Sequence, residues 1–255
     1  MAREELEQLE GRNVVLEALR RGRRPVRRVW LDERAKPDPK VNEIRALAES
    51  KGVPLQLVPR YRLDEKSQTG VHNGVIAEAV PRQTPTVAAL LDELFAAGEL
   101  PFLVLVDEVQ YEHNLGAILR SALGAGVHAV VVPVVRGKGL SPVVHRVAMG
   151  GAEEVPLIRE GLSSALAALR RAGVRIVGAD MDGGAPWETP MSGAVAIVLG
   201  GEDKGLSPTL RARCDAIVGV PLAKGLESLN VSVTAGILLF EKVRQDRVPR
   251  APRER

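Results

Sequence analysis

The fold of this chain is decided by residues 194–245, AVAIVLGGEDKGLSPTLRARCDAIVGVPLAKGLESLNVSVTAGILLFEKVRQ. The pattern predicts a strand, a Gly-rich turn, a short helix, a second strand, a second Gly-rich turn and a long helix. Each turn joins the carboxyl end of an apolar strand to a helix start, where backbone N–H groups are free and glycine lets a ligand approach. Ordinary connections in any α/β protein have the same outline. The polar residues Glu202, Asp203, Ser228 and Asn230 favour a ligand site.

The segments that precede this stretch predict further strand–helix units. The apolar run at 102–109, FLVLVDEV, is typical of a strand buried on both faces of a parallel sheet. The helix after it is expected to begin near Asn114 and to carry Arg120 about one and a half turns in. The motif KGLSP occurs at 138–142 and 204–208, where serine is an N-cap candidate with proline at the first helical position. Strands are also expected at 129–134, 154–158 and 174–180, and helices at 141–149 and 161–172.

The first eighty residues predict a separate small α/β unit. Helices expected at 10–22, 41–50 and 62–67 alternate with strands expected at 26–32, 54–59 and 74–80. The segment PRQTPT at 81–86 has two prolines and marks a boundary. The expected organisation is therefore an N-terminal domain at 1–80, a linker with a first helix at 81–98, a larger domain at 99–245 and a basic tail at 246–255.

The charge distribution suggests a nucleic-acid partner. The chain has 255 residues and a net charge of only +3, but residues 19–28 hold six arginines and no acidic residue. Guanidinium groups bind phosphate oxygens in pairs, so RNA contact is favoured over a merely solvated helix end. Aromatic residues make up 3%, which argues against base stacking as the main mode of binding. The RNA-binding candidates are Arg20, Arg21, Arg23, Arg24, Arg27, Arg28 and, in the TGVHNG loop, His72, for which a surface histidine without a role is the alternative.

Several classes of protein are disfavoured by missing motifs. A single cysteine, Cys214, excludes a disulfide framework, and the four histidines show no metal-ligand spacing, so no metal is expected. No apolar run approaches ~20 residues and no signal peptide opens the sequence, so we expect a cytoplasmic protein without a membrane partner. Dinucleotide, P-loop and zinc-protease motifs are missing from the larger domain. The polar residues that remain on its turns are Asn114, Arg120, Glu202, Ser228 and Asn230, a set suited to holding a hydroxyl and its phosphate.

Three segments resemble the sequence motifs of the SpoU/TrmH branch of the SPOUT methyltransferases. They are NLGAILRSALGAGV at 114–127, VLGGEDKGLSP at 198–208 and VGVPLAKGLESLNVSVTAGILLFE at 218–241, in the family's order. RVAMGGAEEVPL at 146–157 is similar to the family as well. The N-terminal domain resembles the family's substrate-binding domain, which shares its outline with small ribosomal proteins. The GVHNG loop favours those members that methylate the ribose 2′-oxygen of a guanosine in 23S ribosomal RNA.

This resemblance implies a fold, a cofactor and an assembly. The expected fold is α/β, with a parallel sheet whose carboxyl-terminal part is threaded into a deep trefoil knot, a rare exception to unknotted chains. S-adenosylmethionine would sit bent in the knot, held largely by main-chain groups. A homodimer is implied, with the long helix after Asn230 as a candidate interface. The implied cofactor contacts are Leu199, Gly200, Gly201, Val218, Val220, Leu222, Ser228 and Leu229.

The resemblance also assigns the central catalytic role to Arg120. An arginine with a pKa above ~12 is a poor proton acceptor. We expect Arg120 to hold the target phosphate or to stabilise the developing alkoxide. A phosphate oxygen or Glu202 would take the proton, and Asn114 and Asn230 would orient the ribose and the motif loops.

Three alternatives remain open from sequence. A transfer-RNA 2′-O-methyltransferase is one, although such relatives usually lack a discrete N-terminal domain. An antibiotic-resistance ribosomal RNA methylase shares the two-domain plan. A non-catalytic RNA-binding assembly factor that kept the knot is the third, and the full set of polar motif residues argues against it.

Overall fold

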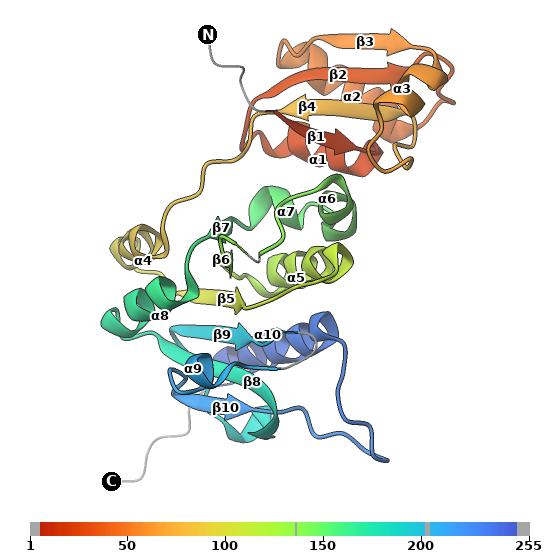
Figure 1. Cartoon of the computed structure of the whole chain (residues 1–255). Coiled ribbons are helices and arrows are strands. Elements are labelled where there is room, and N and C mark those ends of the chain that lie inside the picture. The colour runs from red at the N-terminus through yellow and green to blue at the C-terminus, as the bar shows by residue number, and fades with distance from the viewer. Residues whose placement is uncertain (1–5, 136, 202–204, 249–255) are drawn as a thin grey trace. The chain divides into compact units, whose positions relative to one another are not determined.

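The computed structural model describes residues 6–135, 137–201 and 205–248 (Figure 1). The described chain forms two compact units. The first contains the residues up to Gln83 together with Gly139–Glu154, and the second contains Thr84–Lys138 and the residues from Val155 onward. A short segment from the second half of the sequence therefore folds with the N-terminal part.

The first unit is built on a four-stranded sheet of order β1-β4-β2-β3. Strand β2 is parallel to β3, and β4 is antiparallel to both β1 and β2. Strands β1, β2 and β3 consequently run the same way, and their carboxyl ends share one edge. The elements are β1 (Glu7–Glu10), α1 (Arg12–Arg21), β2 (Val26–Asp32), α2 (Pro39–Ser50), β3 (Leu55–Val58), α3 (Arg60–Lys66), β4 (Val75–Ala79), α6 (Pro142–Ala148) and α7 (Gly151–Glu154).

Local sequence explains where the first two helices begin and end. Gly22 follows α1 with a left-handed backbone at φ 62°, a conformation that glycine adopts without strain. Helix α2 begins after Asp38, whose carboxylate accepts from the N–H of Lys40 at 2.8 Å, with Pro39 at the first helical position. Both helices bury one apolar face, including Leu19 and Ile44, against the sheet. Each such large side chain stabilises the fold by roughly 1.5–3 kcal/mol.

The second unit is a six-stranded sheet of order β10-β8-β9-β5-β6-β7, and each of its neighbouring pairs is parallel. Strand β5 is buried along its whole length, which confirms the interpretation of its continuous apolar run, and β6 and β9 are buried in the same way. The elements are α4 (Val87–Ala96), β5 (Phe102–Val106), α5 (Glu112–Ala125), β6 (Ala129–Val132), β7 (Leu157–Arg159), α8 (Leu162–Arg171), β8 (Arg175–Gly184), η1 (Pro186–Glu188), β9 (Val195–Leu199), α9 (Pro208–Arg211), β10 (Ala216–Val218) and α10 (Val231–Arg247).

Helices α5 and α10 pack side by side at this sheet (Figure 1). Gly236 of α10 faces Ser121 of α5 across this contact, where a built Cβ would lie 3.8 Å from Ser121 Oγ, an ordinary van der Waals distance. Helix α4 packs against α8, and both helices contribute side chains to an apolar core shared with the strands of the sheet. The predicted serine caps are confirmed, since Ser141 Oγ accepts from Val144 N and Ser207 Oγ accepts from Leu210 N, both at 3.3 Å.

The structure differs from the sequence prediction in a few elements. Strand β1 and the short α7 were not expected. The strand expected at 154–158 begins only at Leu157, because α7 runs to Glu154 and two residues outside helix and strand follow it. Helix α7 joins the first unit because its acidic residues meet arginines there, as described below.

Candidate functional site

The carboxyl ends of β9 and β5 meet at one edge of the large sheet. Strands β5 and β9 are adjacent and parallel, and Leu199, at the end of β9, accepts a hydrogen bond from the N–H of Asp107 at 3.0 Å. Gly200 and Gly201 follow directly. In open parallel sheets ligands bind at this edge, where the strands deliver their turns.

The turn after β9 tolerates only glycine at Gly200. A Cβ built there would lie 2.2 Å from the main-chain carbon of Gly205, which no side chain could accept. Gly201 and Gly205 exchange two backbone hydrogen bonds, at 3.0 and 3.1 Å. Glu202, a predicted catalytic residue, lies outside the described residues.

The turn after β10 is also held by close backbone contact. A Cβ on Gly219 would lie 2.6 Å from the carbonyl oxygen of Asp180, and one on Gly183 would lie 2.3 Å from the main chain of Val218. Between described residues, segment 220–229 makes one backbone–backbone hydrogen bond outside helices and strands, from Leu226 N to Ala223 O at 3.3 Å. Most main-chain donors of this turn are thus available to water or to a ligand. Of the predicted cofactor contacts here, Val220, Leu222 and Leu229 are half-buried and Ser228 is exposed.

Two predicted catalytic residues meet across the site. The side-chain amide of Asn230 donates to Asn114 Oδ1 at 3.1 Å. Its oxygen caps α10 by accepting from the N–H of Ser232 at 2.9 Å and from the Ser232 hydroxyl at 2.6 Å. One side chain therefore joins the first motif, on α5, to the third motif, at the start of α10.

Arg120 lies on α5, six residues after Asn114, at a distance of about 9 Å along the helix axis. Its side chain is exposed and makes no hydrogen bond or ion pair within the described part of the chain. The full guanidinium fork can therefore bind an oxygen ligand.

Two carboxylates near the turns were missed by sequence reasoning. The Cβ of Glu108 lies 3.4 Å from a Cβ built on Gly201, and the carboxylate of Asp180 lies 3.5 Å from one built on Gly205. Asp180 also pairs with Arg211 at 3.2 Å. Glu108 and Asp180 stand at the ends of strand patterns, VLVDEV and VGAD, and this position could have indicated that they lie beside the turns.

The exposed arginines of residues 19–28 are largely engaged by acids of the first unit. Arg20 holds Glu43 through two bonds of 2.6 Å. Arg21 and Arg23 each pair with Glu154 of α7 at 3.1 Å. Burial alone would raise the pKa of Glu154, but these arginines hold that pKa below its usual value. Arg27 is exposed, and Arg28 is exposed over the Trp30 ring at 5.6 Å.

The structure corrects the interpretation of Arg24 and His72 as RNA contacts. Arg24 is 6% exposed and forms ion pairs with Glu7 and Glu153. His72 is 1% exposed, its Nε2 lies 2.8 Å from Asp64 Oδ1, and its Nδ1 accepts from the N–H of Gly74. Both side chains are held inside the first unit by these contacts and leave very little surface for a ligand.

Other kinds of site find little support in the described ranges. No group of three or more His, Cys, Asp or Glu side chains is placed there to hold a metal ion. Burial raises the pKa of the Cys214 thiol to about 11, so its thiolate is not available at neutral pH. Within the same ranges, none of the helices has the length and apolar character needed to span a membrane.

Solved structures identify the class to which this fold and site belong. A solved RNA 2′-O ribose methyltransferase is 25% identical, with a TM-score of 0.76 over 95% of this chain and 89% of that one. The SpoU methyltransferase AviRb from Streptomyces viridochromogenes, solved with AdoMet, is 24% identical, with a TM-score of 0.77 over 93% and 89% of the two chains. The chain has the α/β fold of the SpoU/TrmH methyltransferases.

Sequence comparison then gives the family. The SpoU rRNA Methylase family matches residues 101–240, and the family of RNA 2′-O ribose methyltransferase substrate-binding domains matches residues 8–85. The 23S rRNA (guanosine-2′-O-)-methyltransferase RlmB of Escherichia coli (strain K12) is 44% identical over 199 residues, 77% of this chain and 82% of that protein. RlmB of Pseudomonas putida is 37% identical over 249 residues, 96% and 99% of the two chains. This chain belongs to the SpoU rRNA Methylase family.

Proposed function

We propose that this chain transfers a methyl group from S-adenosylmethionine to the ribose 2′-oxygen of a guanosine in 23S ribosomal RNA. The observation that carries the proposal is the Asn114–Asn230 hydrogen bond, which joins two family motifs beside the glycine turns of a parallel sheet. The choice of guanosine as the target nucleoside and of 23S rRNA as the substrate rests on the names of the RlmB relatives, at 37–44% identity. The reaction then belongs to the cytoplasm, where ribosomal RNA is made.

The turns fit the proposed cofactor. The segment 220–229 offers main-chain donors and acceptors, since one backbone–backbone hydrogen bond between described residues is made within it, while the half-buried Leu222 and Leu229 offer apolar surface. An adenosine group needs both, because its flat base is apolar on its faces and polar at its edge. Leu199 and Val218, buried at the strand ends, would support the two turns from below.

When bound, S-adenosylmethionine supplies a methyl group already activated by a positively charged sulfur. The chain's task is to align a ribose oxygen with that group and to help remove its proton, and alignment alone supplies much of the rate. Asn114 and Asn230 hold the motif loops and the ribose in place. The exposed fork of Arg120 binds the target phosphate or stabilises the developing alkoxide. Glu202 or a phosphate oxygen accepts the proton.

The proposal includes the family's knot and a homodimer. The exposed face of α10 carries Val233, Ile237 and Phe240, which are 50%, 37% and 51% exposed. Their i, i+4, i+7 spacing places them on one stripe of the helix. We propose that a second copy of the chain covers this stripe.

The transfer-RNA alternative has weaker support. The TrmH/SpoU tRNA modifying enzyme of A. aeolicus is 26% identical and covers 63% of this chain, with a TM-score of 0.53 over 84% of its own length. A dedicated substrate-binding domain matches residues 8–85, and the RlmB relatives, which are named for 23S rRNA, cover most of this chain. A pure RNA-binding factor would not bind the methyl donor at all.

The test combines donor binding with methyl transfer. Calorimetry should detect S-adenosylmethionine binding, and labelled methyl groups should pass to 23S rRNA transcripts faster than to tRNA transcripts. Arg120→Lys should retain donor binding and lose most of the transfer rate, because lysine keeps the charge but lacks the fork. Absence of donor binding would reject an enzymatic function, and preferential transfer to tRNA would reject the ribosomal substrate.

A further inference from the structure

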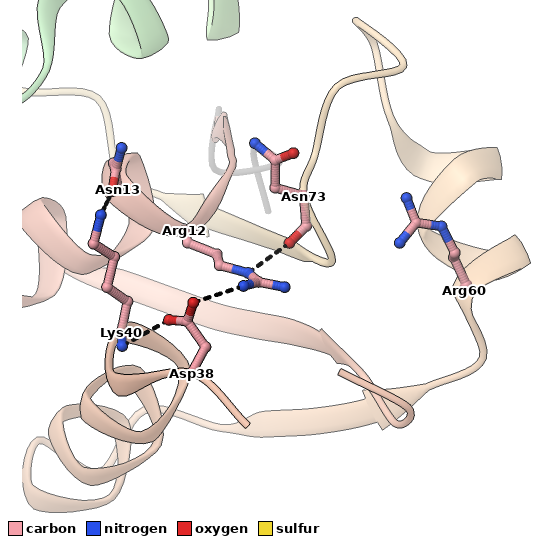
Figure 2. Close-up of a pocket in the computed structure, with 6 residues that line it drawn as sticks. All are labelled: Arg12, Asn13, Asp38, Lys40, Arg60 and Asn73. Carbon is pink, nitrogen blue, oxygen red and sulfur yellow. Dashed lines mark hydrogen bonds and ion pairs between the residues drawn. The ribbon is translucent and has the colours of Figure 1, made fainter. Parts of the chain in front are cut away.

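The first unit contains a pocket that the proposed mechanism does not use. Figure 2 shows the residues that line it, Arg12, Asn13, Asp38, Lys40, Arg60 and Asn73. The pocket has a volume of about 420 Å³. That volume is within the range of small-ligand sites. With three cationic side chains and one carboxylate in its lining, the pocket is basic.

Sheet topology explains why these residues meet. Strands β1, β2 and β3 run in the same direction, so α1, α2 and α3, which follow them, all begin at one edge of the sheet. Arg12 and Arg60 are the first residues of α1 and α3, and Lys40 is the second residue of α2. Asn73 precedes the antiparallel β4 and so reaches the same edge. This is the edge at which open α/β sheets bind ligands.

Internal bonds hold the pocket in shape and leave donors free. Arg12 Nε donates to the carbonyl oxygen of Asn73 at 2.9 Å, and Arg12 Nη1 pairs with Asp38 Oδ2 at 3.0 Å. Lys40 Nζ donates to Asn13 Oδ1 at 2.6 Å. The two bonds from Arg12 use two of its five N–H groups, and the rest of the fork is half-exposed.

The other two side chains of the lining, Arg60 and Asn73, make no side-chain hydrogen bond with a described residue, and Arg60 has one long ion pair. Arg60 is 62% exposed, and its nearest acid, Asp32, is 3.7 Å away. In Figure 2 Arg60 stands apart from the bonded group on the far side of the pocket. The Asn73 amide makes no hydrogen bond among the described residues, and its backbone has the left-handed φ of 50° that asparagine tolerates. Asp38 accepts two backbone N–H bonds and faces Arg12. Burial would raise the pKa of Asp38, but these bonds and Arg12 hold that pKa below its usual value. The carboxylate that orients Arg12 therefore stays ionised.

We propose that this pocket binds one nucleotide of the RNA substrate through its phosphodiester, with Arg12, Lys40 and Arg60 on the phosphate and the amide of Asn73 on the base edge. Arginine forks and a lysine are suited to phosphate oxygens, and an amide offers both a donor and an acceptor to a base. The inference rests on the proposed function for the identity of the substrate. It moves the RNA contact from Arg24 and His72, which are buried, to residues that sequence reasoning did not select.

A matched pair of arginines tests the pocket. Arg60 and Arg62 lie on the same helix and are 62% and 61% exposed, but only Arg60 lines the pocket. Arg60→Gln should weaken binding of the full chain to a 23S rRNA transcript about five-fold, and Lys40→Gln with Arg60→Gln about twenty-fold. The logarithmic salt slope of binding should fall by about 0.7 to 0.9 for each phosphate interaction that a substitution removes. Arg62→Gln should leave affinity and slope close to those of the unsubstituted protein.

Donor calorimetry on the same variants separates the two proposals. The pocket is supported if Arg60→Gln raises the KM for RNA while the affinity for S-adenosylmethionine stays unchanged. If Arg60→Gln and Arg62→Gln bind RNA equally well, the pocket proposal is overturned and the methyltransferase proposal stands. If the unsubstituted chain binds neither the donor nor the transcript, the proposed function itself fails, and the pocket proposal fails with it.

Discussion

Asn230 is expected to do two separable things, and two substitutions distinguish them. Its oxygen caps α10, and its amide holds Asn114 at 3.1 Å. Asn230→Ser keeps a capping oxygen but is too short to reach Asn114, whereas Asn230→Ala removes both interactions. Loss of a cap typically costs ~1 kcal/mol, and an exposed neutral hydrogen bond contributes about 0.5 kcal/mol.

The expected results follow from these values. In Asn230→Ala the amide of Ser232, which bonds Asn230 Oδ1 at 2.9 Å, should exchange its hydrogen roughly five-fold faster, since ~1.4 kcal/mol is a factor of ten. In Asn230→Ser that exchange rate should change little. Methyl transfer should slow by about two- to three-fold in Asn230→Ser, because the bridge to Asn114 is gone. Amide exchange by NMR and initial rates of transfer measure the two effects.

Thr86→Ala is the matched control. Thr86 Oγ1 caps α4 through the N–H of Ala89 at 3.2 Å, in the same unit but away from the turns. The Thr86→Ala variant should lose a similar amount of helix stability and keep the methyl-transfer rate of the unsubstituted protein. The reasoning fails if Asn230→Ser transfers methyl groups at the unsubstituted rate, or if Thr86→Ala slows transfer to the same extent.

Three further predictions concern stability and assembly. Arg24→Met removes the arginine paired with the buried Glu153 and leaves, among the described side chains, only the His145 ring, at 3.5 Å, beside that carboxylate. The substitution should destabilise the first unit by about 3–5 kcal/mol in urea unfolding, whereas the exposed Arg20→Met should change little. The buried carboxylate of Glu10 accepts hydrogen bonds from Thr69, Gln68 and Ser67. Burial raises the pKa of Glu10, but these bonds hold that pKa below its usual value of 4.5. The stability that ionised Glu10 contributes is therefore present above pH 4.5 and is lost as the pH falls through the lowered pKa. In Glu10→Gln the free energy of unfolding, measured as a function of pH, should lack this acid-dependent decrease. Phe240→Arg should convert the proposed dimer to monomers in sedimentation, and Phe95→Arg, at similar exposure on α4, should not.

Local chemistry made much of this fold predictable. The pattern VRRVWLD predicted β2 at its observed bounds, and the apolar run that contains β5 predicted a strand buried on both faces. The serine–proline starts of α6 and α9 also followed from sequence, since an N-cap depends on neighbours within three residues. The positions of Asn114 and Asn230 on the turns selected them as candidates, the resemblance to a family supplied their roles, and the structure shows them in contact.

The remaining features depend on contacts between distant residues. Arg24 pairs with Glu153, which is 129 residues away, and no local pattern distinguishes this buried arginine from its exposed neighbours. His72 has the sequence surroundings of a surface-loop histidine, and only the fold brings Asp64 against its ring. The basic pocket escaped prediction for the same reason, because Arg12, Lys40 and Arg60 meet only after three strands align in one sheet.

The central claim is that this chain methylates a ribose oxygen of guanosine in 23S ribosomal RNA. Its most direct test is mass spectrometry of nucleosides from a 23S rRNA transcript incubated with the protein and S-adenosylmethionine. The account predicts 2′-O-methylguanosine at a single position, absent when Arg120→Ala replaces the unsubstituted protein. A methyl group on a base, or a transcript that stays unmethylated, would contradict it.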